Sequence, residues 1–64
     1  MTYTIKTNEK QRTATIRVYE GRELIAKYQT YPFGVEDFKT VLHWTENDIK
    51  NFLRYEDGSY FEVK

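Results

Sequence analysis

The sequence lacks cysteine altogether and contains only one histidine, one proline and three glycines in 64 residues. Without cysteine the chain can form no disulfide, and a lone histidine cannot hold a metal ion. No apolar run approaches the roughly 20 residues that span a bilayer, and the opening MTYTIK has no basic segment followed by an apolar one. These absences predict a soluble, cytoplasmic protein with no metal, no cofactor and no membrane contact.

Residues for catalysis are also scarce. A nucleophilic mechanism needs a nucleophile, a base and an orienting group in one pocket, and His43 is the only candidate base. Ser59 lies in a terminal DGS turn, and the isolated glycines form no phosphate-binding loop. The paired carboxylates at 36–37 and 56–57 flank predicted helix ends, and acids at a helix start need no catalytic explanation. The sequence therefore predicts that the protein is not an enzyme.

Aromatic residues, at 17% of the chain, are what the sequence does have. A chain of this length folds near the lower limit at which one hydrophobic core suffices. Large rings bury more area than aliphatic side chains, so they compensate for the small size. We predict a single domain over residues 1–64, with self-association as a homodimer as an additional source of stability.

Alternation of apolar and polar residues with a period of two predicts strands at both ends of the chain. The segment YTIKT, residues 3–7, directs Tyr3 and Ile5 toward the core. The final segment SYFEVK alternates in the same way and directs Phe61 and Val63 inward.

Residues 12–31 predict a hairpin around Gly21, which takes a positive φ without strain. The apolar positions of its two strands match best with a three-residue loop or a bulge, which pairs Val18 with Leu24. Under this register, further core-facing positions are Ala14, Ile16, Ala26 and Tyr28.

The helical region allows three interpretations. Apolar residues at helical spacing are Val35, Phe38, Leu42, Ile49 and Phe52. TEND is a near capping box with Thr45 as N-cap, and Trp44 and Ile49 stand at hydrophobic staple positions. Two abutting helices, one bent helix and a strand over 37–44 all remain open, and the capping box favours two helices. The predicted fold class is α+β, an antiparallel sheet of about four strands (β-β-β-α-β) with a helical segment, broken near His43-Trp44, packed on one face.

Charge is balanced overall but uneven along the chain. Ten basic and ten acidic residues cancel, which argues against strong nonspecific binding to nucleic acids or membranes. Residues 1–32 carry six basic and three acidic residues, whereas residues 33–64 carry four basic and seven acidic residues. If the first half is sheet and the second mostly helix, the molecule has an electrostatic dipole. The alternative is that the charges are scattered over a small surface.

Binding to another protein is the function that the aromatic content favours. A small aromatic chain cannot bury every ring, and exposed aromatic patches mark interaction sites. We expect Trp44 to reach outward, because the helical stripe constrains it least. The alternative is that these residues pack on the sheet. The candidate partner-binding residues are Tyr31, Phe33, Asp37, Phe38, Leu42 and Trp44.

Single-stranded nucleic-acid binding is the second hypothesis. Rings interleaved with cations can stack bases and hold phosphates. The predicted outer face of the sheet carries such a set, although tyrosine and lysine also suit solvent-facing strand positions without any ligand. The candidate nucleic-acid-binding residues are Arg17, Tyr19, Lys27 and Tyr31.

From Ala14 onward, the order of elements resembles the small dimeric inhibitors of uracil-DNA glycosylase made by some phages. EDFKTVLHWTENDIK is similar, without a gap, to their helical segment, with Asp37-Phe38, Thr45 and Ile49 in common. The resemblance implies that Phe38, with Asp37 beside it, grips an apolar side chain of the enzyme's DNA-binding loop. Leu42 stands where that family has a tyrosine. By analogy, the chain is a phage or mobile-element inhibitor of a host DNA-acting enzyme and works in the host cytoplasm.

Overall fold

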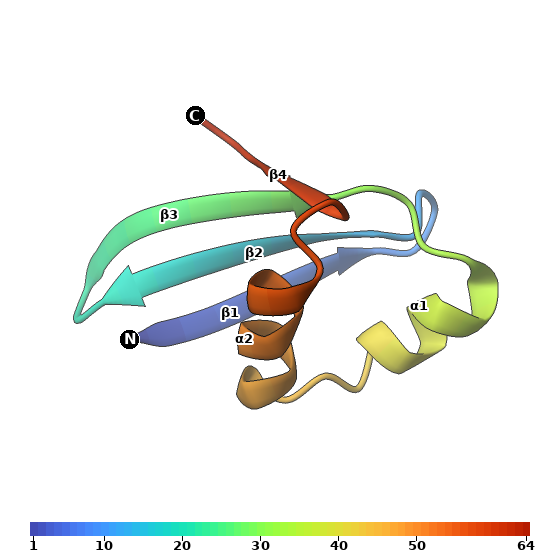
Figure 1. Ribbon diagram of the computed structural model, residues 1–64, viewed down its shortest axis with the longest axis horizontal. Coiled ribbons are helices and arrows are strands. Elements are labelled where there is room, and N and C mark those ends of the chain that lie inside the picture. Colours follow the sequence, from blue (N-terminus) through green and yellow to red (C-terminus); the bar gives the residue numbers. More distant parts are fainter.

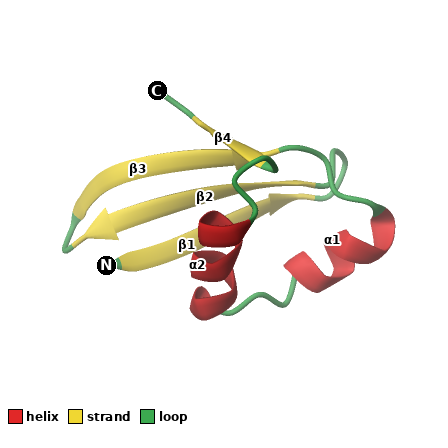
Figure 2. Ribbon diagram, in the orientation of Figure 1, coloured by secondary structure: helices red, strands yellow, loops and turns green.

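The computed structural model describes all of residues 1–64 and consists of a four-stranded antiparallel sheet with two helices on one face (Figure 1). The strands β1 (Thr2–Asn8), β2 (Thr13–Glu20), β3 (Glu23–Thr30) and β4 (Tyr60–Glu62) lie side by side in chain order. The helices α1 (Val35–Val41) and α2 (Glu46–Tyr55) occur between β3 and β4. Figure 2 shows the sheet and the helices as two layers. Neither helix is long and apolar enough to cross a membrane. The predicted α+β class is confirmed.

The first two strands pair in the register that inward-facing apolar residues require. Tyr3 lies opposite Val18 and Ile5 lies opposite Ile16. All four side chains belong to one core cluster or pack against it. The prediction that Tyr3 and Ile5 face inward is therefore confirmed.

The hairpin between β2 and β3 turns through two residues, Gly21 and Arg22. Gly21 has a φ of 62°, a left-handed conformation that glycine adopts without steric cost. Glu20 and Glu23 pair across the turn. The turn is therefore one residue shorter than the predicted three-residue loop.

A β-bulge follows the turn and resets the register. Tyr19 pairs with Leu24 and Val18 pairs with Ala26, so Ile25 is the extra residue. A bulge was one of the favoured alternatives, but the predicted pairing of Val18 with Leu24 is wrong. The bulge moves Leu24 out of the core and leaves it exposed.

The last strand directs Tyr60, not Phe61, toward the core. Tyr60 packs against the core cluster, and its O–H donates to the carbonyl oxygen of Leu53 at 2.6 Å. Phe61 pairs with Gln29 and is 43% exposed. The predicted inward position of Phe61 is wrong, because alternation does not tell which of two neighbouring rings faces in, and Tyr60 gains the hydrogen bond to α2.

Two separate helices form, and the capping box begins the second one. Thr45 Oγ1 accepts a hydrogen bond from the Asp48 N–H at 3.2 Å, and Asp48 Oδ2 accepts one from the Thr45 N–H at 2.9 Å. These bonds satisfy backbone donors that have no partner inside the helix. The interpretation with two helices is confirmed, and the bent helix and the strand over 37–44 are wrong.

The core lies between the sheet and the helices and has two adjoining parts. The larger cluster contains Ile16, Val18, Ile49 and Phe52, and the smaller one contains Ala14, Phe38 and Val41. Three half-buried side chains pack against both clusters, namely Ile5, Phe33 and Trp44. Both helices are thereby held to the sheet.

The two halves of the chain occupy different layers, except that β4 of the second half joins the sheet. Residues 1–32, with net charge +3, contain β1, β2 and β3, whereas residues 33–64, with net charge −3, contain both helices. Figure 1 shows both helices on the same side of the sheet. The condition that we stated for an electrostatic dipole is met.

Candidate binding surface

The residues predicted to bind a protein partner differ in exposure, and Phe38 is the most buried of them. Phe38 is only 6% exposed and packs with Ala14 and Val41. It has the i,i+3 spacing to Val41 that puts both side chains on the face of α1 toward the sheet. Phe38 is therefore a core residue in this fold and has almost no surface to offer a partner.

Trp44 also points inward. Its ring centre lies 4.9 Å from that of Phe52 and 6.0 Å from that of Phe33, in an edge-to-face arrangement with Phe33. The residue precedes the N-cap of α2, where an apolar side chain closes the first turn onto the core. The expectation that Trp44 reaches outward is wrong. Phe33 is half-buried in the same aromatic group.

The other predicted partner-binding residues are exposed. Asp37 lines a hollow of about 360 Å³ together with Phe33 and Trp44. Asp37 and Leu42 are on α1 and at its end, whereas Tyr31 packs against Phe61 of β4. Leu42 borders a hollow of about 550 Å³ between the helices, together with His43. No three histidine, aspartate or glutamate side chains gather where they could hold a metal ion.

The sheet face opposite the helices is uncovered, and we call it the open face. Its strand residues follow from alternation and pairing, since neighbours across two strands point to the same side. Three of them are cations and none is acidic. The residues are Thr2, Thr4, Lys6, Asn8, Thr13, Thr15, Arg17, Tyr19, Leu24, Lys27, Gln29 and Phe61, and Tyr31 follows directly after β3. The four residues of the nucleic-acid hypothesis thus lie on one face.

Arg17 and Lys27 stand directly opposite each other at the middle of the open face. Like charges in this position repel each other and destabilise a sheet. The one ion pair in the structure joins Lys39 to Glu36 on α1, so neither cation of the open face has an acidic partner. The pair is an unfavourable arrangement that a bound anion would relieve.

Aromatic rings flank this pair of cations. Tyr31 and Phe61 form one exposed pair, with ring centres 5.3 Å apart. Tyr19 lies on the other side of Arg17 along β2 and is half-buried. Sequence reasoning missed Phe61, because it placed that ring in the core. The signal that could have found it is Tyr60, whose hydroxyl favours the side next to a helix.

A shallow hollow adjoins the open face at the turn between β1 and β2. Its volume is about 560 Å³, and its charged lining residues are Lys6, Lys10, Arg17 and Glu9. Three cations against one carboxylate leave the hollow positive. The basic character of the face therefore extends from Lys27 to this turn.

Comparisons of the chain with models of known protein families, with curated proteins and with solved structures find no match.

Proposed function

We propose that the protein is a noncatalytic module that binds single-stranded nucleic acid through its open face. The observation that carries the proposal is the unpaired Arg17-Lys27 pair at the centre of that face. A phosphate placed between the two cations gains charge-assisted hydrogen bonds and removes their repulsion. The surrounding face contains no carboxylate that would repel the backbone of the nucleic acid.

The rings favour single strands over duplex. An exposed ring on a sheet can stack only on a base that is not already stacked between its neighbours in a duplex. Phe61 pairs with Gln29, which pairs with Thr15, four residues from Tyr19. Tyr19 therefore lies roughly 14 Å along the strands from Phe61, because each residue advances about 3.4 Å. Arg17 and Lys27 lie between these rings. A single strand of nucleic acid that crosses the sheet could therefore contact the rings with its bases and the cations with its phosphates.

The uneven distribution of charge between the two layers limits this binding to one side of the molecule. The helix layer is acidic and would repel a nucleic acid, so the strand should contact the sheet alone. Covering single-stranded DNA would also deny that substrate to a DNA-acting enzyme. This route to inhibition differs from the direct contact with the enzyme that the resemblance implies.

The test of the charged pair is a titration of fluorescein-labelled oligo(dT) and oligo(U) by anisotropy at several salt concentrations. We expect the double variant Arg17→Thr, Lys27→Thr to lower the affinity at least tenfold at low salt. The slope of log affinity against log salt should fall by about 0.7, because the two cations share one phosphate and each neutralised phosphate of a single strand contributes about 0.7. Threonine suits strand positions, so the sheet should be retained.

The matched control is the double variant Arg22→Thr, Lys39→Thr, which removes two exposed charges outside the open face. It should leave both the affinity and the salt slope near the wild-type values.

Stacking is tested by Tyr31→Ala with Phe61→Ala, which should cost about 1–3 kcal/mol per stacked base. Tyr55→Ala, which removes an exposed ring from α2, is its control. Equal losses in the control and open-face variants would reject the open face as the binding surface.

A further inference from the structure

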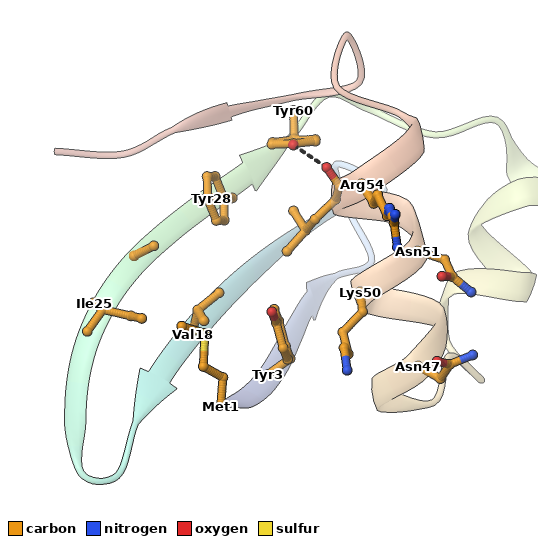
Figure 3. Close-up of a pocket in the computed structure, with 12 residues that line it drawn as sticks. Met1, Tyr3, Val18, Ile25, Tyr28, Asn47, Lys50, Asn51, Arg54 and Tyr60 are labelled. Atoms are coloured by element: carbon orange, nitrogen blue, oxygen red, sulfur yellow. Dashed lines mark hydrogen bonds between the residues drawn. The ribbon is translucent and has the colours of Figure 1, made fainter.

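The helix side of the sheet is only partly covered. α2 packs on β1 and β2 through Ile49 and Phe52, and the ends of β2 and β3 nearest their turn lie beyond it (Figure 1). A groove of about 570 Å³ lies between α2 and this uncovered end. Figure 3 shows its lining residues, which come from α2 and from all four strands or their ends. None of the residues predicted to bind a protein partner lines it.

Eight of the twelve residues that line the groove are hydrophobic, and three of these eight are tyrosines. Val18, Ala26 and Leu53 belong to the core cluster or pack against it, and they present their remaining surface to the groove. Ile25 lines the groove as well and is 41% exposed. The bulge in β3 turns Ile25 to the helix side, away from the open face on which simple alternation predicts it. An exposed isoleucine beside buried core residues is a typical contact point for an apolar partner group.

The charged side chains that line the groove are both positive, and the nearby Glu46 carboxylate accepts a hydrogen bond from the Tyr3 N–H at 3.1 Å. Lys50 and Arg54, one turn apart on α2, are its charged lining residues, and no carboxylate lines it. Lys50 Nζ lies 5.9 Å from the centre of the Tyr3 ring, and neither cation forms an ion pair. Like charges at this spacing on a helix repel each other. A carboxylate bound beside Lys50 and Arg54 could form ion pairs with both side chains.

The tyrosines close one end of the groove. Tyr28 and Tyr60 meet edge to face with ring centres 5.2 Å apart, and Tyr60 donates its hydrogen bond to Leu53 (Figure 3). The Tyr60 hydroxyl group therefore already donates its proton to the Leu53 carbonyl oxygen and cannot donate it to a ligand. The groups in the groove that are free to contact a ligand are its apolar side chains and the two α2 cations.

We propose that this groove binds a segment of a partner protein in which a large apolar side chain is flanked by carboxylates. The apolar lining would take the side chain, and Lys50 and Arg54 would take the carboxylates. The groove is open to solvent, so a free small molecule would stay largely in water. A protein segment brings its own covering surface and is the better occupant.

The proposal is tested with blocked heptapeptides that carry a central leucine or phenylalanine between two glutamates, two lysines or two serines. Each is titrated at up to millimolar concentration into isotope-labelled protein, and amide and methyl NMR shifts are followed. We expect saturable shifts at Ile25, Ala26 and Leu53 with the glutamate peptides, and about tenfold weaker binding of the lysine peptides.

Charge reversal makes the result specific to the groove. The exposed pair Lys50→Glu, Arg54→Glu should exchange the preference, so that lysine peptides bind more tightly than glutamate peptides. Arg22→Glu with Lys39→Glu makes the same change in net charge elsewhere and should keep the original preference. Arg17→Thr with Lys27→Thr should also keep it, which separates this proposal from that of the open face.

Three results would overturn the proposal. The first is the absence of saturable shifts in the groove with every peptide. The second is equal binding of glutamate and lysine peptides. The third is movement of the same resonances when the protein alone is diluted, which would mean that a second copy of the chain occupies the groove.

Discussion

Tyr60 packs in the core, donates a hydrogen bond to α2 and has a raised pKa. Its ring centre lies 5.6 Å from that of Phe52, and its O–H donates to the Leu53 carbonyl oxygen at 2.6 Å. Burial raises the pKa of the Tyr60 phenol above its ordinary value, and the nearby Tyr28 and Asp57 raise it further. The phenol is thereby kept neutral, the form that can donate the hydrogen bond to α2.

We predict that Tyr60 makes the protein less stable at alkaline pH. Because the pKa of Tyr60 is higher in the folded state, its contribution is fully present below the ordinary tyrosine pKa of about 10 and is lost as pH rises through the folded value. Tyr60→Phe should cost about 1 kcal/mol at neutral pH, the usual value of one hydrogen bond. Urea unfolding from pH 7 to 11 measures both effects.

The control for this prediction is Tyr55→Phe, which changes the most exposed of the tyrosines, at 68%. It should leave stability unchanged at every pH. The difference between wild type and Tyr60→Phe should shrink above pH 10. A difference that stays constant to pH 11 would contradict the proposed link to ionisation.

At the scale of the elements, α2 is the part best predicted from local sequence. Its cap uses hydrogen bonds between residues three apart, so Thr45 and Asp48 suffice to locate its start. The hairpin was predicted less well. Its bulge inserts Ile25 into β3, and alternation along the strands gives no information about an inserted residue.

We predict that the capping box contributes measurably to stability. Asp48→Ala removes the acceptor for the Thr45 N–H and should lower the free energy of unfolding by about 1 kcal/mol. The loss would be transmitted to the core, because Ile49 and Phe52 follow directly on the same helix. Thermal and urea unfolding with circular dichroism provide the measurement.

Two variants bracket the capping effect. Thr45→Ser keeps a hydroxyl acceptor for the Asp48 N–H and should be nearly neutral. Asn47→Ala alters an exposed side chain in the same turn, without the cap, and should also be nearly neutral. Alanine is the better helix former, so helix propensity alone cannot make Asn47→Ala costly. If Asn47→Ala is as costly as Asp48→Ala, the loss comes from truncating any side chain in this turn and not from the capping box.

At the scale of the whole molecule, the two parts of the core are expected to unfold together. Ile5, Phe33 and Trp44 pack against both clusters, so neither helix can leave the sheet without exposing residues of the other. Small single domains with one shared core commonly unfold in a two-state transition.

We therefore predict that Ile16→Ala weakens the entire fold. Ile16 is fully buried at the centre of β2, and removing its side chain should cost about 2–5 kcal/mol. That is a large part of the roughly 5–15 kcal/mol that stabilises a typical domain. Trp44 fluorescence and far-UV circular dichroism should give the same urea midpoint, in wild type and variant alike. Separate midpoints would show that α1 and its junction unfold independently.

Local interactions written in the sequence were sufficient for the α+β class, the four strands, the inward side of β1 and the start of α2. They involve residues that are neighbours in the chain, where hydrogen bonding and alternation act over a few positions. The direction of Trp44, the exposure of Phe61 and the burial of Phe38 could not be obtained in this way. These depend on packing between distant residues, in which one ring displaces another from a shared core. The Arg17-Lys27 pair and the groove beside α2 arise from the same source, since strand pairing and the bulge determine which side chains meet.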